Sequence, residues 1–453
     1  PLYLLTLLQS MEAGRSGDFK ESALGYYYQY LLTEAFQLSG VKPEKLTEIF
    51  QYSAHLAWEF HLYKKSELAK DELREFNDRF SKHWVTVDFS PRLEVLLAAR
   101  VLCRVGDDYK FRYPYIYYYL KGQYLSQNLS DLDVRAYIGH CTQHLYVRDH
   151  ANTVLFLAHH SNDEFVLNSI AESLHGLFRI HAPVTFDGDT AGIKRLIEDA
   201  PKLTYSGESP VEHRKRRNEL QDQLDDGHDG LSEMEESSPE LSLIAQMTML
   251  FKTTEILGQV LKNQYAKIPR KRKVDLLEAL FNGPLRAIRD FYSYLEKNPD
   301  ALVAEIDAAL LRKGKVDKEE DRKAIARRVV ASLVQIITFS FVLRAAQSAN
   351  SDSLSEDVRE VVKKNPTLAF KLIEINIILD SPKAIPRQKL KLLHKEVEKD
   401  LVAARLLQIM VLNRLYMFKT TEQDMQWLKG ELNIDLGIQH AITYQEKSRR
   451  LVK

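Results

Sequence analysis

Several features that would mark a familiar chemistry are missing from these 453 residues. The string GxxxxGK[ST], which cradles nucleotide phosphates with backbone N–H groups, does not occur. Positive and negative side chains are balanced, with Lys+Arg and Asp+Glu at 63 each, so no overall field favours nucleic acid or an acidic membrane surface. We therefore predict that this chain is not an enzyme by itself and does not hydrolyse nucleotide.

Cysteine, targeting and membrane signals are also scarce. Cys103 and Cys141 are the only cysteines, and both stand among apolar or aromatic residues, as is typical of buried thiols in a reducing cytosol. No basic region precedes an apolar segment near Pro1, so we predict no signal peptide and a cytoplasmic protein. The longest apolar run, 329–343, is shorter than the roughly 18–20 residues that span a bilayer. It therefore predicts a buried core helix and no membrane partner.

What the sequence does contain is helical periodicity along most of its length. A helix is expected over 66–84, with Ser66 as its N-terminal cap. Near residues 270–298 we expect two helices, because Gly283 and Pro284 interrupt the pattern. Residues 182–187 are expected to form a short extended segment.

The clearest strands lie around Gly106. Residues 101–105 are apolar or β-prone, and Gly106, Asp107 and Asp108 supply the turn residues of a hairpin. Pro114 then opens a helix crowded with tyrosines. A helix, a hairpin and an aromatic helix in this order are typical of a winged-helix subdomain.

We therefore predict a mainly α protein. It has a winged-helix subdomain with a short β-hairpin, followed by a helical-repeat-like α array in two lobes. The array comprises residues 126–203 and 241–453. A charged stretch at 204–240, nearly without large apolar residues, is expected to link them.

Two sets of polar residues allow other functions. His140, Cys141 and His144, with His150 or His159 as a fourth ligand, could place metal ligands near one helical turn, but the paired spacing usual for zinc is absent and half-buried His and Cys are commoner than ligands. A metal-dependent enzyme is therefore the least favoured hypothesis, and no metal site is predicted.

The basic strings 214–217 and 270–273 could contact phosphates. Acidic residues follow each within a few positions, so we interpret both as solvated. The expected recognition helix of the winged helix, 91–101, is nearly all apolar and suits packing against protein better than reading bases. Nucleic acid is thus an unfavoured partner, although a standalone helical adaptor with a nucleic-acid-binding winged helix remains the alternative function.

Residues 109–125, YKFRYPYIYYYLKGQYL, resemble the helix that closes the winged-helix subdomain of NACHT-type STAND NTPases. The opening PLYLLTLLQS, which has no initiator Met, resembles the helix after the sensor proline of their ATPase module, so we expect this chain to be part of a longer polypeptide. The strings EILGQVLKNQ and PLRAIRDFYSYL are similar to bacterial STAND proteins of antiphage defence. The resemblance makes 1–40 lid helices, 41–125 the winged helix and 241–453 a helical sensor or scaffold.

The resemblance implies a switch. An upstream NTPase core would bind ATP or ADP with Mg²⁺, and the winged helix would hold the core inactive. The helical region would sense a protein ligand, for which a phage protein is expected, and homo-oligomerisation would then activate an N-terminal effector.

The resemblance also implies two nucleotide-contacting residues. Pro1 would be the sensor proline against the adenine, and Tyr113 stands where many NACHT members have a histidine that reaches the ADP phosphate. A tyrosine can donate a hydrogen bond but brings no positive charge.

Overall fold

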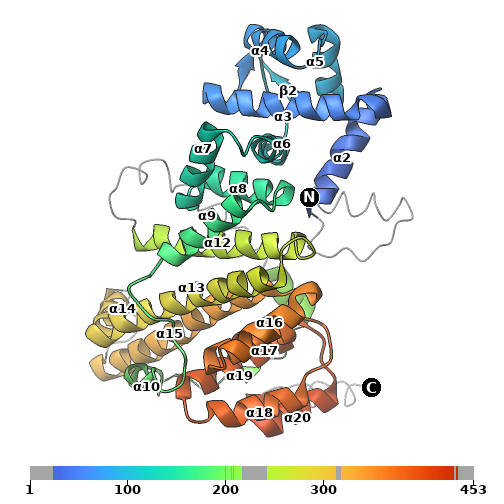
Figure 1. Ribbon diagram of the computed structural model, residues 1–453. Coiled ribbons are helices and arrows are strands. Elements are labelled where there is room, and N and C mark those ends of the chain that lie inside the picture. The colour runs from blue at the N-terminus through green and yellow to red at the C-terminus, as the bar shows by residue number, and fades with distance from the viewer. Residues whose placement is uncertain are drawn as a thin grey trace, which may run out of the picture. The chain divides into compact units, whose positions relative to one another are not determined.

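The computed structural model of the protein describes residues 24–198, 200–201, 203–205, 207, 209–216, 242–312, 318–432 and 435–436. The chain divides into two compact units, residues 1–170 with 259–267 and residues 171–258 with 268–453. Each unit is described by itself. Helices dominate the described residues (Figure 1), so the prediction of a mainly α protein is confirmed.

The first unit contains a small antiparallel sheet. Strand β1 (Leu68–Ala69) pairs with β3 (Asp108–Phe111), which pairs with β2 (Leu102–Val105). The predicted hairpin is confirmed, since β2 and β3 are joined at Gly106, whose φ of 60° is a conformation that glycine adopts without strain.

Strand β1 was not predicted, and the helix expected to begin at Ser66 begins later, at Lys70. The carboxylate of Glu72 accepts a hydrogen bond from the backbone N–H of Ala69 at 2.8 Å, which caps the helix there. Leu68, just ahead of this cap, is fully buried and pairs with Tyr109. The start of the helix is therefore fixed by Glu72 and by the sheet.

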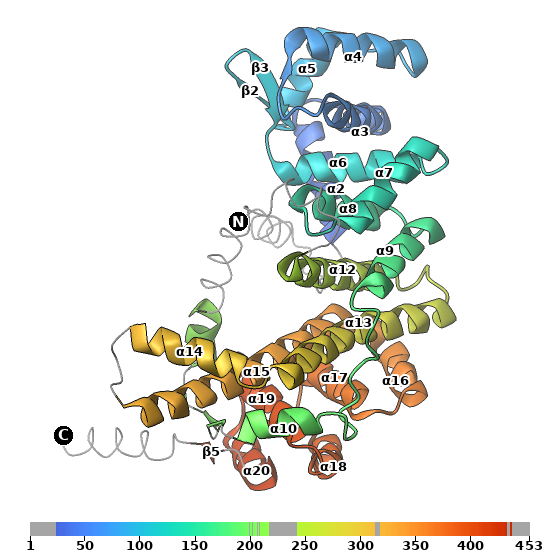
Figure 2. The same ribbon diagram turned by 90° about the vertical axis from the view of Figure 1, so that its left-hand side faces the viewer.

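Helices surround this sheet and extend the unit. In Figures 1 and 2, α4 and α5 lie on one side of α3, and α6 lies on the other. The helical elements of the unit are α2 (Leu24–Leu38), η2 (Pro43–Lys45), α3 (Leu46–Tyr63), α4 (Lys70–His83), α5 (Phe89–Ala98), α6 (Pro114–Gln127), α7 (Leu132–Gln143) and α8 (Arg148–His160).

Helix α6 is packed on both sides, against α3 and α8. At Gly122 the backbones of α6 and α8 come so close that a Cβ atom there would lie 2.8 Å from the backbone nitrogen of Leu157 and from the carbonyl carbon of Phe156. Glycine at this position is therefore what permits the close crossing of the two helices.

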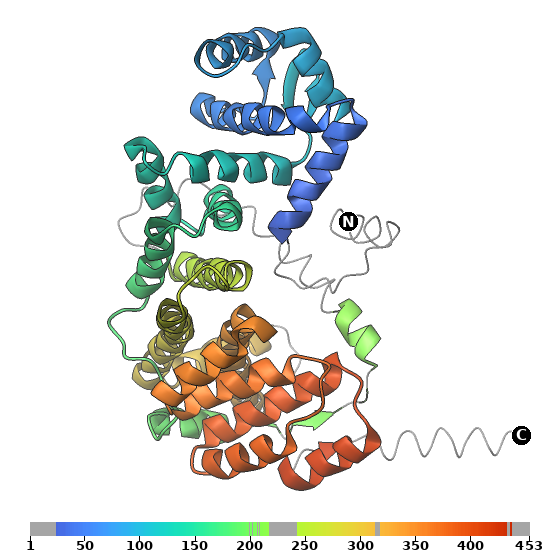
Figure 3. The ribbon, with the colours of Figure 1, turned by 45° about the vertical axis from the view of Figure 1, so that its right-hand side comes forward.

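The second unit is built of helices packed around α15 (Glu319–Ala349), which contacts α10, α13, α14, α17 and α19. Figure 3 shows the stacked C-terminal helices of this unit. Its other helical elements are α10 (Ala191–Glu198), α13 (Arg270–Lys297), α14 (Ala301–Arg312), η4 (Asp352–Leu354), α16 (Ser355–Lys364), α17 (Leu368–Leu379), α18 (Arg387–Val397), α19 (Leu401–Met417) and α20 (Glu422–Leu432).

Two helices cross the division between the units. Helix α9 (Glu164–Gly176) and helix α12 (Leu243–Asn263) each contribute residues to both units. In the second unit, strand β4 (Thr204–Tyr205) pairs in parallel with β5 (Asp435–Leu436). Residues 210–216 are helical, and 217–241 of the predicted linker lie outside the described residues.

Helix α13 corrects the prediction of two helices, because it runs unbroken through Gly283 and Pro284. A Cβ on Gly283 would lie 2.6 Å from the Cδ1 atom of Leu174, so the glycine sits at a tight contact in the core. Pro284 removes one backbone donor, but both residues are buried. Tertiary packing thus outweighs the local helix-breaking tendency.

Residues 182–187 form no strand, which corrects the expected extended segment. The side chain of Asp189 accepts hydrogen bonds from the backbone N–H groups of Thr185 and Phe186, at 2.8 and 2.9 Å. The segment is therefore a loop held by a carboxylate, and its backbone polar groups are satisfied without a sheet.

Helix α15 is, among the described residues, the one helix long and apolar enough to cross a membrane. Half of its most apolar window is buried inside the unit. Val330, Val334 and Phe341 face the core with 2% exposure or less. Its burial agrees with the prediction of a core helix over 329–343.

Gly122→Ala tests the crossing of α6 and α8. The added methyl group would overlap the α8 backbone, so we expect a loss of about 1–3 kcal/mol in the free energy of unfolding. Gly139→Ala on α7 is the matched control, because nothing lies within 4 Å of a Cβ there; it should change stability by no more than about 1 kcal/mol, in the stabilising direction. Urea unfolding measures both, and equal effects would contradict the close crossing.

Candidate functional site

Tyr113 is the N-cap residue of α6, with extended backbone (φ −130°, ψ 134°). Two features place it there: β3 ends at Phe111, and Pro114 opens the helix at a position where a missing N–H costs nothing. The Tyr113 carbonyl accepts a hydrogen bond from the Ile116 N–H at 3.1 Å. Its ring is half-buried at the junction of strand and helix.

Arg112 is the neighbour that the sequence reasoning missed. Its guanidinium lies 5.6 Å from the centre of the Tyr113 ring, and its Nε donates a hydrogen bond to the phenolic oxygen at 3.3 Å. The pKa of Arg112 is raised mainly by this hydrogen bond. An exposed, permanently charged group therefore stands beside the tyrosine.

Behind this pair the aromatic rings form a continuous stack. Tyr113 stacks on Tyr115 at 5.5 Å between ring centres and 22° between planes, and Tyr115 stacks on Tyr28 of α2 at 5.3 Å and 29°. Tyr28 in turn contacts Phe156 of α8 at 5.2 Å. Burial raises the pKa of Tyr115, so its phenol stays neutral. Through these rings α6 packs onto α2 and α8.

A buried cation lies about two helical turns further along α6. The side chain of Lys121 is fully buried, with its Nζ 3.4 Å from a carboxylate oxygen of Asp149. The Nζ also lies 5.2 Å from the centre of the Tyr117 ring and 5.0 Å from that of Tyr137. Burial lowers the pKa of this lysine, and the Asp149 carboxylate partly offsets that effect. Nothing in the sequence pattern distinguishes Lys121 from an exposed lysine.

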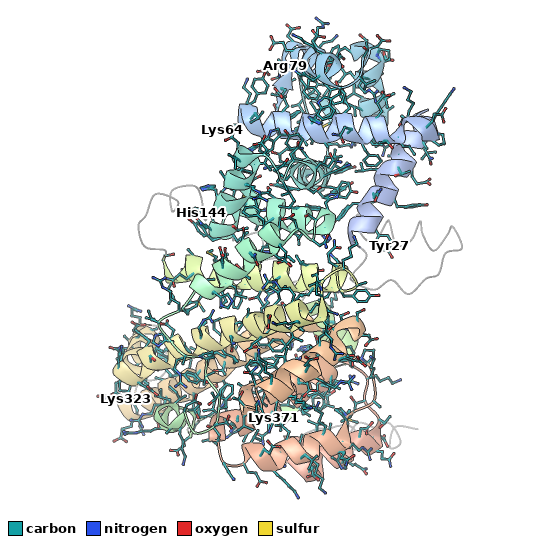
Figure 4. The ribbon with its side chains drawn as sticks, viewed as in Figure 1. Tyr27, Lys64, Arg79, His144, Lys323 and Lys371 are labelled. Carbon is teal, nitrogen blue, oxygen red and sulfur yellow. The ribbon has the colours of Figure 1, made fainter. Side chains whose placement is uncertain are left out.

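The proposed metal ligands are only partly brought together. The rings of His140 and His144 lie 4.3 Å apart, and His150 lies 5.0 Å from His140; Figure 4 labels His144 at the end of α7. Cys141 is fully buried, and His159 contacts Asn263 instead, at 2.7 Å. Among the described residues, no group of three His, Cys, Asp or Glu is arranged to hold a metal ion.

The basic string 270–273 is paired with carboxylates at the start of α13. Arg270 lies 2.9 Å from Glu360, and Lys273 lies 2.9 Å from the buried carboxylate of Asp357. These pairs tie α13 to α16. The interpretation of this string as solvated is therefore wrong for Lys273, whose side chain is only 13% exposed and is paired with a buried carboxylate. In the other string, 214–216 are helical, and Arg217 lies outside the described residues, as does Pro1.

The region around Tyr113 is also where a known family matches. The family model described as Novel STAND NTPase 4 matches residues 66–120, from the segment before β1 into α6. The match includes Arg112, Tyr113 and the first tyrosines of α6. No curated protein and no solved structure matches this chain significantly. The family match supports a relation to the STAND NTPases, with a regulatory role in such a system.

Substitution of His160 tests the polar contacts behind the tyrosine stack. Its Nε2 lies 3.0 Å from the carbonyl oxygen of Tyr119, and burial lowers its pKa to about 4. In the unfolded chain His160 takes up a proton near pH 6.5, whereas in the folded chain it does so only near pH 4. The free energy of unfolding therefore has its full value above pH 6.5 and falls as the pH drops from 6.5 to 4.

His160→Gln keeps a hydrogen-bond donor but removes the titration. Between pH 6.5 and 4 we expect the free energy of unfolding to fall less steeply for the variant than for the parent chain. The difference between the two losses should reach about 3 kcal/mol at pH 4. Urea titrations at several pH values measure the two curves. Parallel curves would show that His160 does not carry the difference.

Proposed function

We propose that this chain is the C-terminal, regulatory part of a bacterial NACHT-like STAND NTPase. The observation that carries the proposal is the family match over 66–120, which lies within the first unit and runs from the segment before β1 into the first half of α6. The order α3, β1, α4, α5, β2, β3, with the strands arranged β1–β3–β2, supports a winged helix closed by α6.

In the proposed switch, ATP or ADP and Mg²⁺ are bound by an NTPase core in the same polypeptide. The winged helix holds that core inactive. The helical array after residue 126 binds a protein ligand, for which we propose a phage protein in antiviral defence. Ligand binding releases the core for homo-oligomerisation in the cytoplasm, and a separate effector is activated.

The pair Arg112–Tyr113 is the part of this chain that we assign to nucleotide contact. The phenol of Tyr113 can donate its proton to a phosphate oxygen, and the Arg112 guanidinium beside it provides positive charge. Together they offer what a single protonated histidine would offer. The Arg112 guanidinium thus supplies the positive charge that a tyrosine alone lacks.

The nucleic-acid alternative is less well supported by α5, the helix that would read DNA. Leu93 and Leu96 are buried, and Arg92 is held by an ion pair with Glu48. The middle of the exposed face carries Glu94, which would repel phosphates.

Substitution of the pair tests the nucleotide contact in the polypeptide that joins this chain to its NTPase core. Because a hydrogen bond from a charged group contributes about 1.5–3 kcal/mol, Arg112→Gln should weaken ADP binding about tenfold or more. Tyr113→Phe should weaken it less, since no charge is lost. Lys110→Gln is the control, because it removes a nearby charge that pairs with Glu67 at 3.2 Å. Equal effects of Arg112→Gln and Lys110→Gln would contradict the assignment.

The proposed division of labour also predicts the behaviour of the chain alone. Without a phosphate-cradling loop it should release no phosphate from ATP above the uncatalysed rate in the presence of Mg²⁺. A coupled phosphate assay on the purified chain measures this. Sustained turnover that follows the chain through a further purification step would overturn the proposal.

A further inference from the structure

Helix α14 of the second unit is unusually apolar for a helix on the surface. Nine of its twelve residues are apolar, and all twelve are described, yet none of them is buried. It packs lengthwise against the first part of α15, and Asp307 and Arg322 join the two helices through an ion pair of 2.6 Å. Figure 2 shows this two-helix hairpin at the edge of the unit.

The first part of α15 adds an exposed apolar stripe. Val329, Leu333 and Ile336 are 38%, 39% and 57% exposed, and Ile325 is half-exposed. Spacings of four, four and three residues place these side chains on one face of the helix. An open groove of 380 Å³ follows this face and is lined by Ile325, Arg328, Val329, Ser332 and Leu333.

The charge that α15 places beside the stripe is positive. Between residues 324 and 336 the only charged residues are Arg327 and Arg328, and both are exposed. Arg328 lines the groove, whereas Arg327, two residues after Ile325, lies on the opposite face of the helix. No Asp or Glu occurs from residue 322 to residue 349. Lys323, labelled in Figure 4, adds a further cation at the start of this stretch, although it pairs with Glu319 at 2.6 Å. The groove therefore has an apolar floor and Arg328 as its charged lining residue.

This chemistry selects among the surfaces that could cover the groove. A second copy would present the same arginines and no carboxylate from the matching stretch. A bilayer would need a broad apolar face, whereas half of the apolar window of α15 is buried in the unit. A single amphipathic helix with acidic residues along its edges fits both the width of the groove and its charge.

We propose that the exposed stripe of α15, where Ile325, Val329 and Leu333 line the groove and Ile336 continues it, binds an acidic amphipathic helix of a protein partner. The apolar face of that helix covers the stripe, and a carboxylate at its edge pairs with Arg328. The inference rests on the proposed function, because it names the chemistry of the protein ligand that the helical array binds, but the binding itself needs neither the NTPase core nor nucleotide.

The experiment uses the purified chain and two synthetic helical peptides. Both are about 18 residues long and cross-linked for helicity, since shorter helices are marginal in water. Both carry leucine at the same i, i+3, i+4 and i+7 positions, one with glutamate and the other with lysine along the edges. Fluorescence anisotropy measures binding. We expect the acidic peptide to bind and the basic peptide not to bind.

Variants then locate the site. Ile336→Asp should weaken binding of the acidic peptide about tenfold or more, since it places a charge on the apolar floor. Leu392→Asp is the matched control, because Leu392 is 59% exposed on α18 of the same unit; it should leave binding unchanged. Arg328→Glu should reverse the preference toward the basic peptide.

Four results would overturn the proposal: no binding of the acidic peptide, equal binding of both peptides, a chain dimer that Ile336→Asp dissociates, or binding of the stripe to neutral lipid vesicles. Thermal melts by circular dichroism show that each variant is folded. If Ile336→Asp does not fold, the Arg328→Glu variant decides the result, because Arg328 is exposed. Failure here would leave the ADP experiment on Arg112 unaffected.

Discussion

The close crossing of α6 and α8 at Gly122 is the constraint on which the first unit depends. Without a Cβ atom there, the backbone of α6 contacts that of α8 at Leu157 and Phe156. This contact leaves the aromatic side chains of α6 only the spaces beside α2, α3 and α8, which they fill. The position of the N-terminal end of α6, and hence of Tyr113, follows from a contact more than two helical turns away.

The buried charge of Lys121, next to Gly122, favours one particular register of α6 against α8. A buried ion pair contributes little net stability, because desolvation offsets the attraction, but separating the two charges is costly. If α6 slid along α8, the ammonium would leave Asp149 and the rings of Tyr117 and Tyr137 while still excluded from water. The buried charge thus disfavours other packings of α6, and the contact at Gly122 supplies the closeness.

The sequence predicts those elements whose causes are local. The hairpin at Gly106 and the helix after Pro114 follow from turn and capping chemistry, and both are found. Strand β1 was missed because its two residues are a strand only through pairing with β3. Helix α13 was predicted as two helices because the burial of Pro284 is not visible in its neighbours. Within the site, Tyr113 was predicted from resemblance, whereas Arg112 needed the geometry.

The overall charge balance seen in the composition results in the structure from pairs of opposite charges that lie close together. Equal numbers of acidic and basic residues argued against an overall field, and the structure shows that much of this neutrality is local, as where Arg270 and Lys273 meet Glu360 and Asp357. Such paired charges hold helices together and leave little field for a ligand. Two places differ: Arg112 is held by a phenol rather than a carboxylate, and the α15 stripe has an arginine in a stretch without acids. Because an anion or an acidic helix would complete the pairing in each case, local departures from neutrality are better guides to binding sites in this protein than its net charge.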